Sequence, residues 1–238
     1  MMRRIDLLGR EISYDLQRKN VKNINLRIYP DGRISVSAHR LVREETVARF
    51  LESHAERILR SLDRFAVQRQ SAPAPFTYSD GETILLLGEP YRLCVQEGKK
   101  KEALLFDGVL MLRLPKPEDV EQRKKLLDGY LDALCRTTVT RLCEQIHPSF
   151  APLGVEYPAL RFRRMRSRWG SCHIQKKTVT FNLALVAEPI ACIEYVVWHE
   201  LVHFLHPDHS KEFYQTLARY LPDWRERRDR LNKKQTVA

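Results

Sequence analysis

The chain has 238 residues, of which 43% are hydrophobic and 30% charged, and its net charge is +11. This length is enough for one large domain or two small ones with a normal core and a well-solvated surface. The basic charge suggests polyanions, acidic surfaces or acidic substrates as partners, although a merely basic soluble protein explains it equally well.

The distribution of apolar residues argues against a membrane-spanning or secreted chain. No apolar run reaches the roughly 18 residues that a bilayer span needs. The first ten residues contain no signal-peptide core, because Asp6 and Arg10 interrupt the apolar stretch. The five cysteines are odd in number, widely spaced and without a CxxC pair, which predicts reduced thiols. We therefore expect a cytoplasmic protein without membrane contact.

The N-terminal part of the chain has the patterns of strands and one helix. Residues 23–38 alternate apolar and polar positions around Pro-Asp-Gly, which predicts a β-hairpin. Residues 43–65 carry apolar side chains at helical spacing and predict a single amphipathic helix. A loop rich in Pro, Ala and Ser follows at residues 68–76.

Four more strands are predicted before the pattern becomes helical. Residues 83–95 form two around Gly88-Glu89-Pro90, and residues 97–115 form two around Asp107-Gly108. No internal repeat is evident in the sequence.

The second half of the chain is predicted to be mainly helical. Residues 118–146 form one long amphipathic helix, which Pro148 prevents from continuing. Two short strands, 159–165 and 178–185, flank a turn-rich connection. These patterns predict an α+β fold with a boundary near residue 117. A β-rich region with one helix (1–117) then precedes a helical domain with a small sheet (118–238).

Four of the eight histidines lie in one window, VVWHELVHFLHPDHSKEF, at residues 196–213. Pro189 is predicted to begin a helix here and Pro207 to end it. His199 and His203 are four residues apart, so their imidazoles lie on one helical face, and Glu200 follows the first. This H-E-x-x-H pattern is typical of two zinc ligands beside a carboxylate that activates water.

A catalytic zinc site needs a third protein ligand and an open fourth position. His206 lies on the same face, but seven residues of helix advance roughly 10 Å, so three histidines on one straight helix converge poorly. His209 follows the Pro207 turn and can fold back toward the metal. We therefore predict His209 as the third ligand, with His206 second and Glu212 a more remote option.

A chance match on a buried core helix is the alternative interpretation of this motif. Val196, Val197 and Leu201 predict that the helix is buried, and a buried ionised Glu200 is costly without a compensating cation. The predicted chemistry is therefore metal-assisted peptide hydrolysis with Glu200 as general base. Arg168, Tyr195 and Tyr214 are candidate donors to the developing oxyanion.

The same region resembles a known family. RSRWGSCHIQKKTVTFNLALV followed by IEYVVWHELVHFLHPDHSKEFY closely resembles the YgjP-type metallopeptidases, a zincin group related to the SprT-like and WLM proteases. The R-W-G-S-C, F-N-x-x-L, H-E-L-x-H and H-S-x-x-F stretches carry the likeness. It is closest over residues 160–224, with RIYPDGRISVSA and LLGEPYRL similar to the family's N-terminal region. Tyr214 stands where the family pattern leads us to expect tryptophan.

The resemblance implies a zincin-like domain in which His199, His203 and His209 bind one catalytic Zn²⁺ and Glu200 is the catalytic residue. It implies a peptide or protein substrate. In zincins an edge strand pairs with extended substrate, and residues 160–165 or 178–185 could serve here. Cys172 is interpreted as packing, because a fourth ligand would close the site.

Two other functions are compatible with the sequence. The SprT-like resemblance suggests a protease that acts on nucleic-acid-associated proteins, with basic segments 161–168 and 224–235 contacting phosphates. Salt-dependent DNA binding would distinguish it. The other is a non-catalytic binding module in which zinc is structural and held by four ligands.

Overall fold

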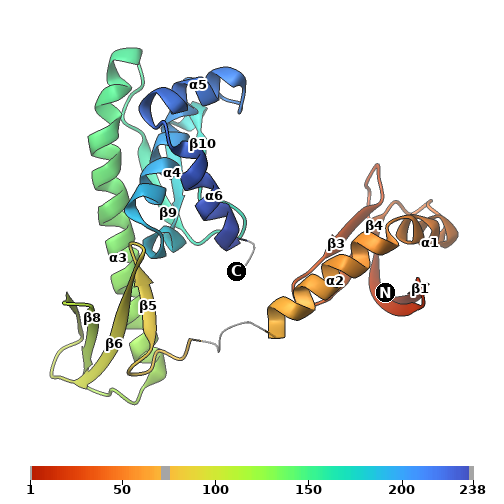
Figure 1. Ribbon diagram of the computed structural model, residues 1–238, viewed down its shortest axis with the longest axis horizontal. Helices are drawn as coiled ribbons and strands as arrows, with labels where there is room; N and C mark the ends of the chain where they lie inside the picture. Colours follow the sequence, from red (N-terminus) through yellow and green to blue (C-terminus); the bar gives the residue numbers. More distant parts are fainter. Residues whose placement is uncertain (1, 71–75, 236–238) are drawn as a thin grey trace. The chain divides into compact units, whose positions relative to one another are not determined.

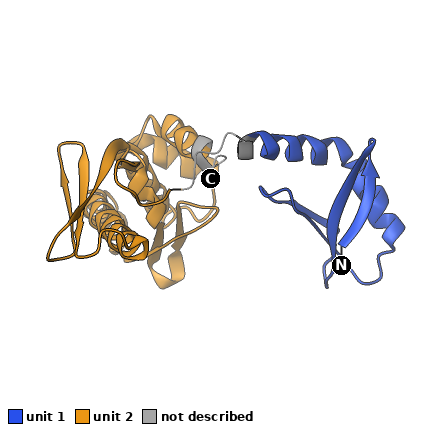
Figure 2. Ribbon diagram, turned by 90° about the horizontal axis from the view of Figure 1, so that it is seen from below, with its two compact units in different colours: residues 1–75 blue, residues 76–238 orange. Residues whose placement is uncertain are grey.

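The computed structural model describes residues 2–70 and 76–235. The chain forms two units, Met1–Pro75 and Phe76–Ala238, which are coloured separately in Figure 2. The predicted loop at 68–76 mostly lies outside the described residues. Among those described, no helix is both long enough and apolar enough to pass through a bilayer. All five cysteines are free thiols, as predicted.

Unit 1 is a four-stranded sheet followed by two helices. The sheet order is β1-β2-β4-β3, in which β2 and β4 are parallel and the outer pairs are antiparallel. The elements are β1 (Met2–Leu7), β2 (Arg10–Arg18), β3 (Asn25–Ile28), β4 (Ile34–Ala38), α1 (Glu44–Ser53) and α2 (Ala55–Gln70). Inward-facing residues such as Val36 pack against Val47, Leu51 and Ile58 of the helices. The predicted hairpin at 23–38 is confirmed.

The prediction of a single helix at 43–65 was wrong. The chain turns at His54, whose φ and ψ of −112° and 10° separate α1 from α2. His54 Nδ1 lies 2.8 Å from the Phe50 carbonyl oxygen and stabilises the turn. Because apolar spacing continues across the break, the sequence pattern did not reveal it.

Unit 2 begins with a second sheet that repeats the topology of the first. Its order is β5-β6-β8-β7, with β6 and β8 parallel. The strands are β5 (Thr83–Leu86), β6 (Glu89–Glu97), β7 (Glu102–Phe106) and β8 (Val109–Leu114). All four predicted strands are present. Both sheets consist of two hairpins joined through parallel central strands, a similarity that was not evident in the sequence.

Helix α3 (Val120–Ile146) joins the second sheet to the rest of unit 2 (Figure 1). Asp119 caps its start by accepting the Gln122 N–H at 3.0 Å. Leu127, near the N-terminal end, packs under the sheet, whereas Val139 and later residues pack against the C-terminal helices. The two compact units therefore divide at residues 75 and 76, and residue 117 lies inside unit 2 rather than between units.

A three-stranded sheet and three helices complete unit 2. The sheet order is β10-β11-β9, with β10 antiparallel and β9 parallel to β11. The elements are β9 (Ala159–Arg163), β10 (Gly170–His173), β11 (Thr178–Asn182), α4 (Ile190–Val202), α5 (Lys211–Tyr220) and α6 (Trp224–Gln235). Short 3₁₀ turns occur at His147–Ser149, Ala151–Leu153, Ile174–Lys176 and Leu183–Ala187. The mixed α+β class is as predicted.

Two predicted details of this sheet were wrong. The strand predicted at 178–185 ends at Asn182, whose side chain accepts the Ala184 N–H at 3.1 Å and begins a 3₁₀ turn. Strand β10 lies in the connection that we predicted to be rich in turns, where we expected no strand. It forms because β11 supplies hydrogen-bond partners, which four residues without clear alternation do not reveal.

The β5–β6 turn holds the second sheet against the start of α4. Leu87 and Gly88 have φ of 51° and 91°, a left-handed pair that suits a tight hairpin. The Leu87 N–H donates to the Val186 carbonyl at 2.7 Å. A Cβ built on Gly88 would lie 2.8 Å from Pro189 Cα, so this turn and the residue before α4 are in close contact.

We predict that Gly88→Ala destabilises unit 2 because the added methyl group overlaps Pro189. Gly108→Ala is the matched control, since Gly108 also has positive φ (73°) in a hairpin turn but has no neighbour within 4 Å. Both substitutions place alanine at a positive φ and strain the backbone. Only Gly88→Ala also brings the added methyl group into overlap with Pro189. We expect it to lower the free energy of unfolding by about 2 kcal/mol more than the control.

All three tryptophans (Trp169, Trp198 and Trp224) lie in unit 2, so urea unfolding followed by tryptophan fluorescence reports this unit. Equal losses for the two glycine variants would contradict the prediction.

Candidate metal centre

Helix α4 places an ionisable sequence inside an apolar core. Val197 and Leu201 are fully buried, and Trp198 stacks on Tyr220 with ring centroids 4.7 Å apart. Pro189 is the N-cap residue rather than the first helical residue. The helix ends at Val202, earlier than the Pro207 stop that we predicted, although the cap residue His203 keeps right-handed helical φ and ψ.

Three histidines converge at the C-terminal end of this helix. One ring nitrogen from each of His199, His203 and His209 lies within 4.8 Å of the others. The Nε2 atoms of His199 and His209 are 3.0 Å apart. His206 and Glu212 do not belong to this group among the described residues. The His206 ring contacts Thr216 Oγ1 at 2.9 Å instead.

The turn after α4 returns His209 to the helix. Immediately after it, Ser210 caps α5 by accepting the Phe213 N–H at 3.3 Å, which starts α5 beside the cluster. The Phe213 ring is fully buried and lies 4.7–5.0 Å, between centroids, from all three imidazoles. Phe213 therefore forms an apolar support for the three rings.

The outward-facing nitrogens of two histidines have polar neighbours. His203 Nδ1 lies 3.1 Å from the His206 carbonyl oxygen, and His199 Nδ1 lies 3.4 Å from the Tyr195 hydroxyl. Contacts of this kind hold ring orientation and tautomer at metal sites. They leave the Nε2 atoms of His199 and His203 available on the inner side of the cluster.

The electrostatic setting favours neutral imidazoles. Burial, together with neighbouring His203 and His209, lowers the pKa of His199 to about 3, and burial also lowers the pKa of His203. A neutral ring keeps the lone pair that binds a metal. Three imidazole nitrogens this close together match the donor set of a divalent cation such as Zn²⁺. The residues present therefore fit a metal ion.

Glu200 is buried directly beside the cluster. Its side chain is 5% exposed, and burial raises its pKa to about 8, against the lowering effects of Arg168 and of the Cys172 backbone N–H, which donates to it. Its Oε2 has no hydrogen-bond partner among the described residues. A Cβ built on Gly170 would overlap Glu200 Oε1 and lie 2.7 Å from its Cγ. Strand β10 thus packs tightly on this carboxyl group.

The three histidines, Glu200 and Gly170 line one cavity of about 390 Å³. Arg168 and Tyr195, two of the predicted oxyanion donors, are part of its wall. Tyr214, the third, stacks on Trp224 at 4.7 Å and is not among the lining residues.

The cavity also contains residues that sequence reasoning missed. Arg228, Leu231 and Asn232 of α6 form part of its wall. Their sequence resembles an ordinary charged terminal helix, so no local signal indicated this position. Gly170 and Phe213 lie within motifs that we noted, but their contacts with Glu200 and the histidines depend on tertiary packing.

Comparison with known proteins agrees with a metallopeptidase site. Residues 22–234 match the model of the YgjP-like metallopeptidase domain, and the chain belongs to this family. No curated protein matches the sequence.

Two solved structures are similar over part of the chain. Abylysin, a metallopeptidase zymogen of Pyrococcus abyssi, is 24% identical with a TM-score of 0.36, covering 40% of this chain and 93% of that one. Jannalysin, a metallopeptidase zymogen of Methanocaldococcus jannaschii, is 22% identical with a TM-score of 0.36, covering 40% and 95%.

We predict that Phe213→Leu weakens metal binding by about tenfold, because the three imidazoles lose their common support. Phe150→Leu is the matched control. Phe150 is also fully buried, but it packs against Trp198 and Tyr220. Titration of the metal-free variants with Zn²⁺ against a chromophoric chelator measures both affinities. Similar stability losses with equal Zn²⁺ affinities would show that the support by Phe213 is unimportant.

We also predict that Gly170→Ala displaces Glu200 and lowers peptide hydrolysis by at least tenfold, because a near-ångström misplacement of the predicted general base is costly. The variant should retain its metal, since the histidines lie outside the overlap. Gly129→Ala in α3, where nothing lies within 4 Å, is the control. Unchanged activity in Gly170→Ala would mean that Glu200 tolerates the methyl group.

Proposed function

We propose that this chain is a zinc-dependent peptidase that hydrolyses peptide bonds, with His199, His203 and His209 as the metal ligands and Glu200 as general base. The observation that supports this most strongly is the placement of three imidazoles beside a buried carboxyl group with an unpartnered Oε2. The zinc ion, when bound, supplies a Lewis acid that polarises the scissile carbonyl group and acidifies water.

The residues of the chain would carry out the proton transfers, position the base and stabilise the oxyanion. Glu200 accepts a proton from the attacking water and passes it to the leaving amine nitrogen. The Cys172 N–H and the packing of Gly170 hold this carboxyl group in one position. Tyr195 is close to the ring of His199 and lines the cavity, where a hydroxyl group can donate to a developing oxyanion.

Strand β10 is the element best placed to bind extended substrate. It is an edge strand of its sheet, and Gly170, Ser171 and Cys172 line the cavity. Strand β11, one of the two candidates from the sequence, is the central strand and has both neighbours occupied. Strand β9, the other candidate, lies at the opposite edge. We therefore assign substrate pairing by β-strand addition to β10.

The two alternative functions have less support. A structural zinc site is closed by four ligands, whereas the group among the described residues contains three histidines. For a nucleic-acid role, part of the positive charge in the basic segments is already compensated. Arg164 pairs with Asp128 and Asp132, and Arg227 pairs with Glu194 and Asp223. Nucleic-acid association and a cytoplasmic location stay predictions.

The decisive test of the function is Glu200→Gln. The amide keeps the shape of the carboxylate but cannot take the proton, so we expect unchanged zinc content and a fall in peptide hydrolysis of at least 100-fold. A broad library of quenched fluorescent peptides measures hydrolysis, and elemental analysis measures zinc. Hydrolysis at the wild-type rate would refute the role of Glu200.

The ligand assignment is tested in parallel by two histidine variants. His209→Ala should lose most of its zinc after purification without added metal, whereas His206→Ala should retain it because His206 contacts Thr216 instead. Full zinc occupancy in His209→Ala would refute the ligand set. If the wild type holds zinc but cuts no peptide in the library, the binding-module alternative gains support.

A further inference from the structure

Two arginines from separate elements line the candidate active-site cavity. Arg168 lies just before β10, and Arg228 lies on α6. Glu200 is the single carboxylate among the described residues of the cavity wall. If Glu200 serves as the base, no other acidic side chain in this wall balances the two guanidinium groups and a bound divalent cation.

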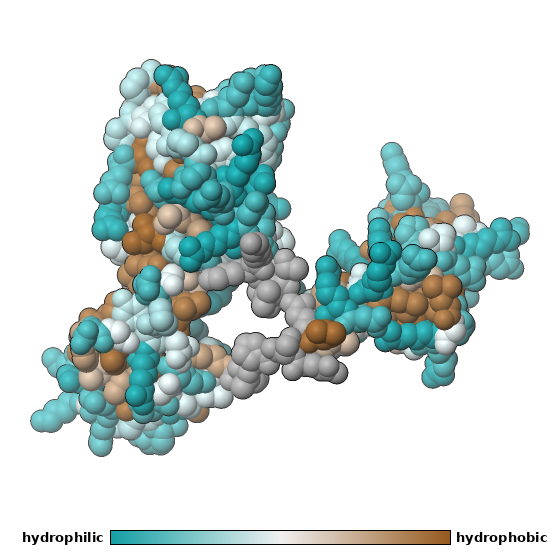
Figure 3. Space-filling model, in the orientation of Figure 1, coloured by the Kyte–Doolittle hydropathy of each residue, from teal (hydrophilic) through white to brown (hydrophobic). Residues whose placement is uncertain are grey.

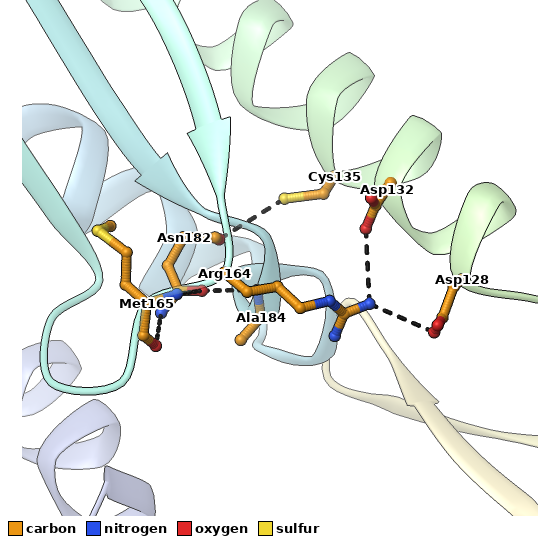
Figure 4. Close-up of polar contacts among 7 residues, drawn as sticks. All are labelled: Asp128, Asp132, Cys135, Arg164, Met165, Asn182 and Ala184. Atoms are coloured by element: carbon orange, nitrogen blue, oxygen red, sulfur yellow. Dashed lines mark hydrogen bonds and ion pairs between the residues drawn. The ribbon is translucent and has the colours of Figure 1, made fainter.

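The backbone around Arg168 is held in place by Asn182. This side chain is 3% exposed, and its Nδ2 donates to the carbonyl groups of Met165 (2.8 Å) and Arg168 (2.9 Å). Its Oδ1 accepts the Met165 N–H at 3.2 Å, and its own backbone N–H donates to the Trp169 carbonyl at 2.8 Å. Figure 4 shows Asn182 between Met165 and Ala184. Arg168 is therefore presented from a well-anchored loop.

Arg164 in the same loop has a different role from Arg168. Its guanidinium lies 3.3 Å from Asp128 and 3.7 Å from Asp132 on α3, so two carboxylates pair with its charge (Figure 4). Arg168 has no ion-pair partner in the part of the chain that the structure describes. Its charge remains available to a molecule in the cavity.

Arg228 is held partly by an aromatic ring. Its guanidinium lies 5.0 Å from the centroid of Trp224, which in turn stacks on Tyr214. It also bonds to Asp229 at 3.2 Å, but the Asp229 side chain is 59% exposed, and exposed pairs of this kind are weak. Figure 3 shows predominantly hydrophilic residues over the α5 and α6 part of unit 2, where water screens such a pair.

Both arginines line the same cavity as Glu200 and Tyr195, so both positive charges border the space that a substrate would occupy. An incoming substrate meets positive charge on both walls, and the net charge of +11 also favours approach of an acidic partner.

We propose that Arg168 and Arg228 bind a carboxylate of the substrate, so that this peptidase prefers peptides with a negative charge close to the scissile bond. Guanidinium groups suit this task because they hold carboxylates through paired, charge-assisted hydrogen bonds. The carboxylate has two possible sources, an Asp or Glu side chain or a free C-terminus. This inference rests on the proposed function, because it names the substrate class of the same cavity.

The test measures binding rather than turnover, in zinc-loaded Glu200→Gln protein. Four labelled peptides share one sequence and differ at one position or at the end: Glu with an amidated C-terminus, Gln amidated, Gln with a free C-terminus, and Lys amidated. We expect a carboxylate peptide to bind about tenfold more tightly than amidated Gln, and Lys to bind most weakly. The Glu and free-C-terminus peptides separate the two sources.

Substitution of the arginines shows whether they cause the preference. With Arg168→Gln and Arg228→Gln together, the carboxylate and neutral peptides should bind within about twofold of one another. Arg166→Gln and Arg225→Gln are matched controls, because these arginines belong to the same loop and helix but do not line the cavity. The controls should keep the full preference. Arg168→Glu should shift the preference toward Lys.

The outcomes separate this inference from the proposed function. Equal binding of all four peptides, or a preference that survives the double substitution, overturns the role of the arginines. Hydrolysis by the wild type without charge preference leaves the peptidase proposal intact and overturns this one. Charge-selective binding without any hydrolysis supports the role of the arginines and overturns the peptidase proposal. If Arg168→Gln instead slows cleavage of every peptide equally, Arg168 is an oxyanion donor and not a substrate-binding group.

Discussion

The structure around the candidate site depends on the burial of Glu200 in the apolar core around helix α4. A carboxyl group at this depth raises the free energy of the fold unless something compensates its charge. The chain offers a backbone N–H from Cys172, the field of Arg168 and, if the three imidazoles hold a cation, a positive ion beside it. Strand β10, the loop before it and the turn to α5 all lie where they provide this compensation.

The rest of unit 2 keeps α4 in place. The helix packs through its apolar faces, and α3 contributes buried residues both to this core and to the separate core of the second sheet. The Leu87–Gly88 turn then contacts the residues just before α4. In unit 1 the corresponding Leu8–Gly9 turn has nearly the same φ angles, 54° and 82°, but Leu8 is 72% exposed. The same type of left-handed turn thus packs against a neighbouring segment in unit 2 but not in unit 1.

Much of the local structure was predictable from the sequence. The long helix α3 and the paired hairpins follow from periodicity and turn residues, because these signals depend on neighbours in the chain. The argument that ranked His206 behind His209 depended only on helical rise, and the His206 ring contacts Thr216 in the structure. The placement of His209 next to His199 followed from the Pro207 turn.

Other features could not be predicted because they depend on distant parts of the chain. The contribution of α3 to the core of the second sheet, through Leu127, was not evident from the change of pattern near residue 117. Strand β10 exists through its pairing with β11, and the break at His54 interrupts a continuous apolar pattern. The arginine of α6 that enters the cavity belongs to a segment whose composition is that of a solvated helix.

The amino-acid sequence by itself determined the chemistry that is available: two histidines one helical turn apart, a carboxylate between them, and a third histidine beyond a proline. These are short-range properties, governed by helical geometry and by the restrictions that proline places on the backbone. Only the tertiary structure decided which strand faces Glu200, which aromatic ring supports the three imidazoles, and which arginines share the cavity. Those choices result from the packing of segments up to about sixty residues apart, which no local pattern encodes.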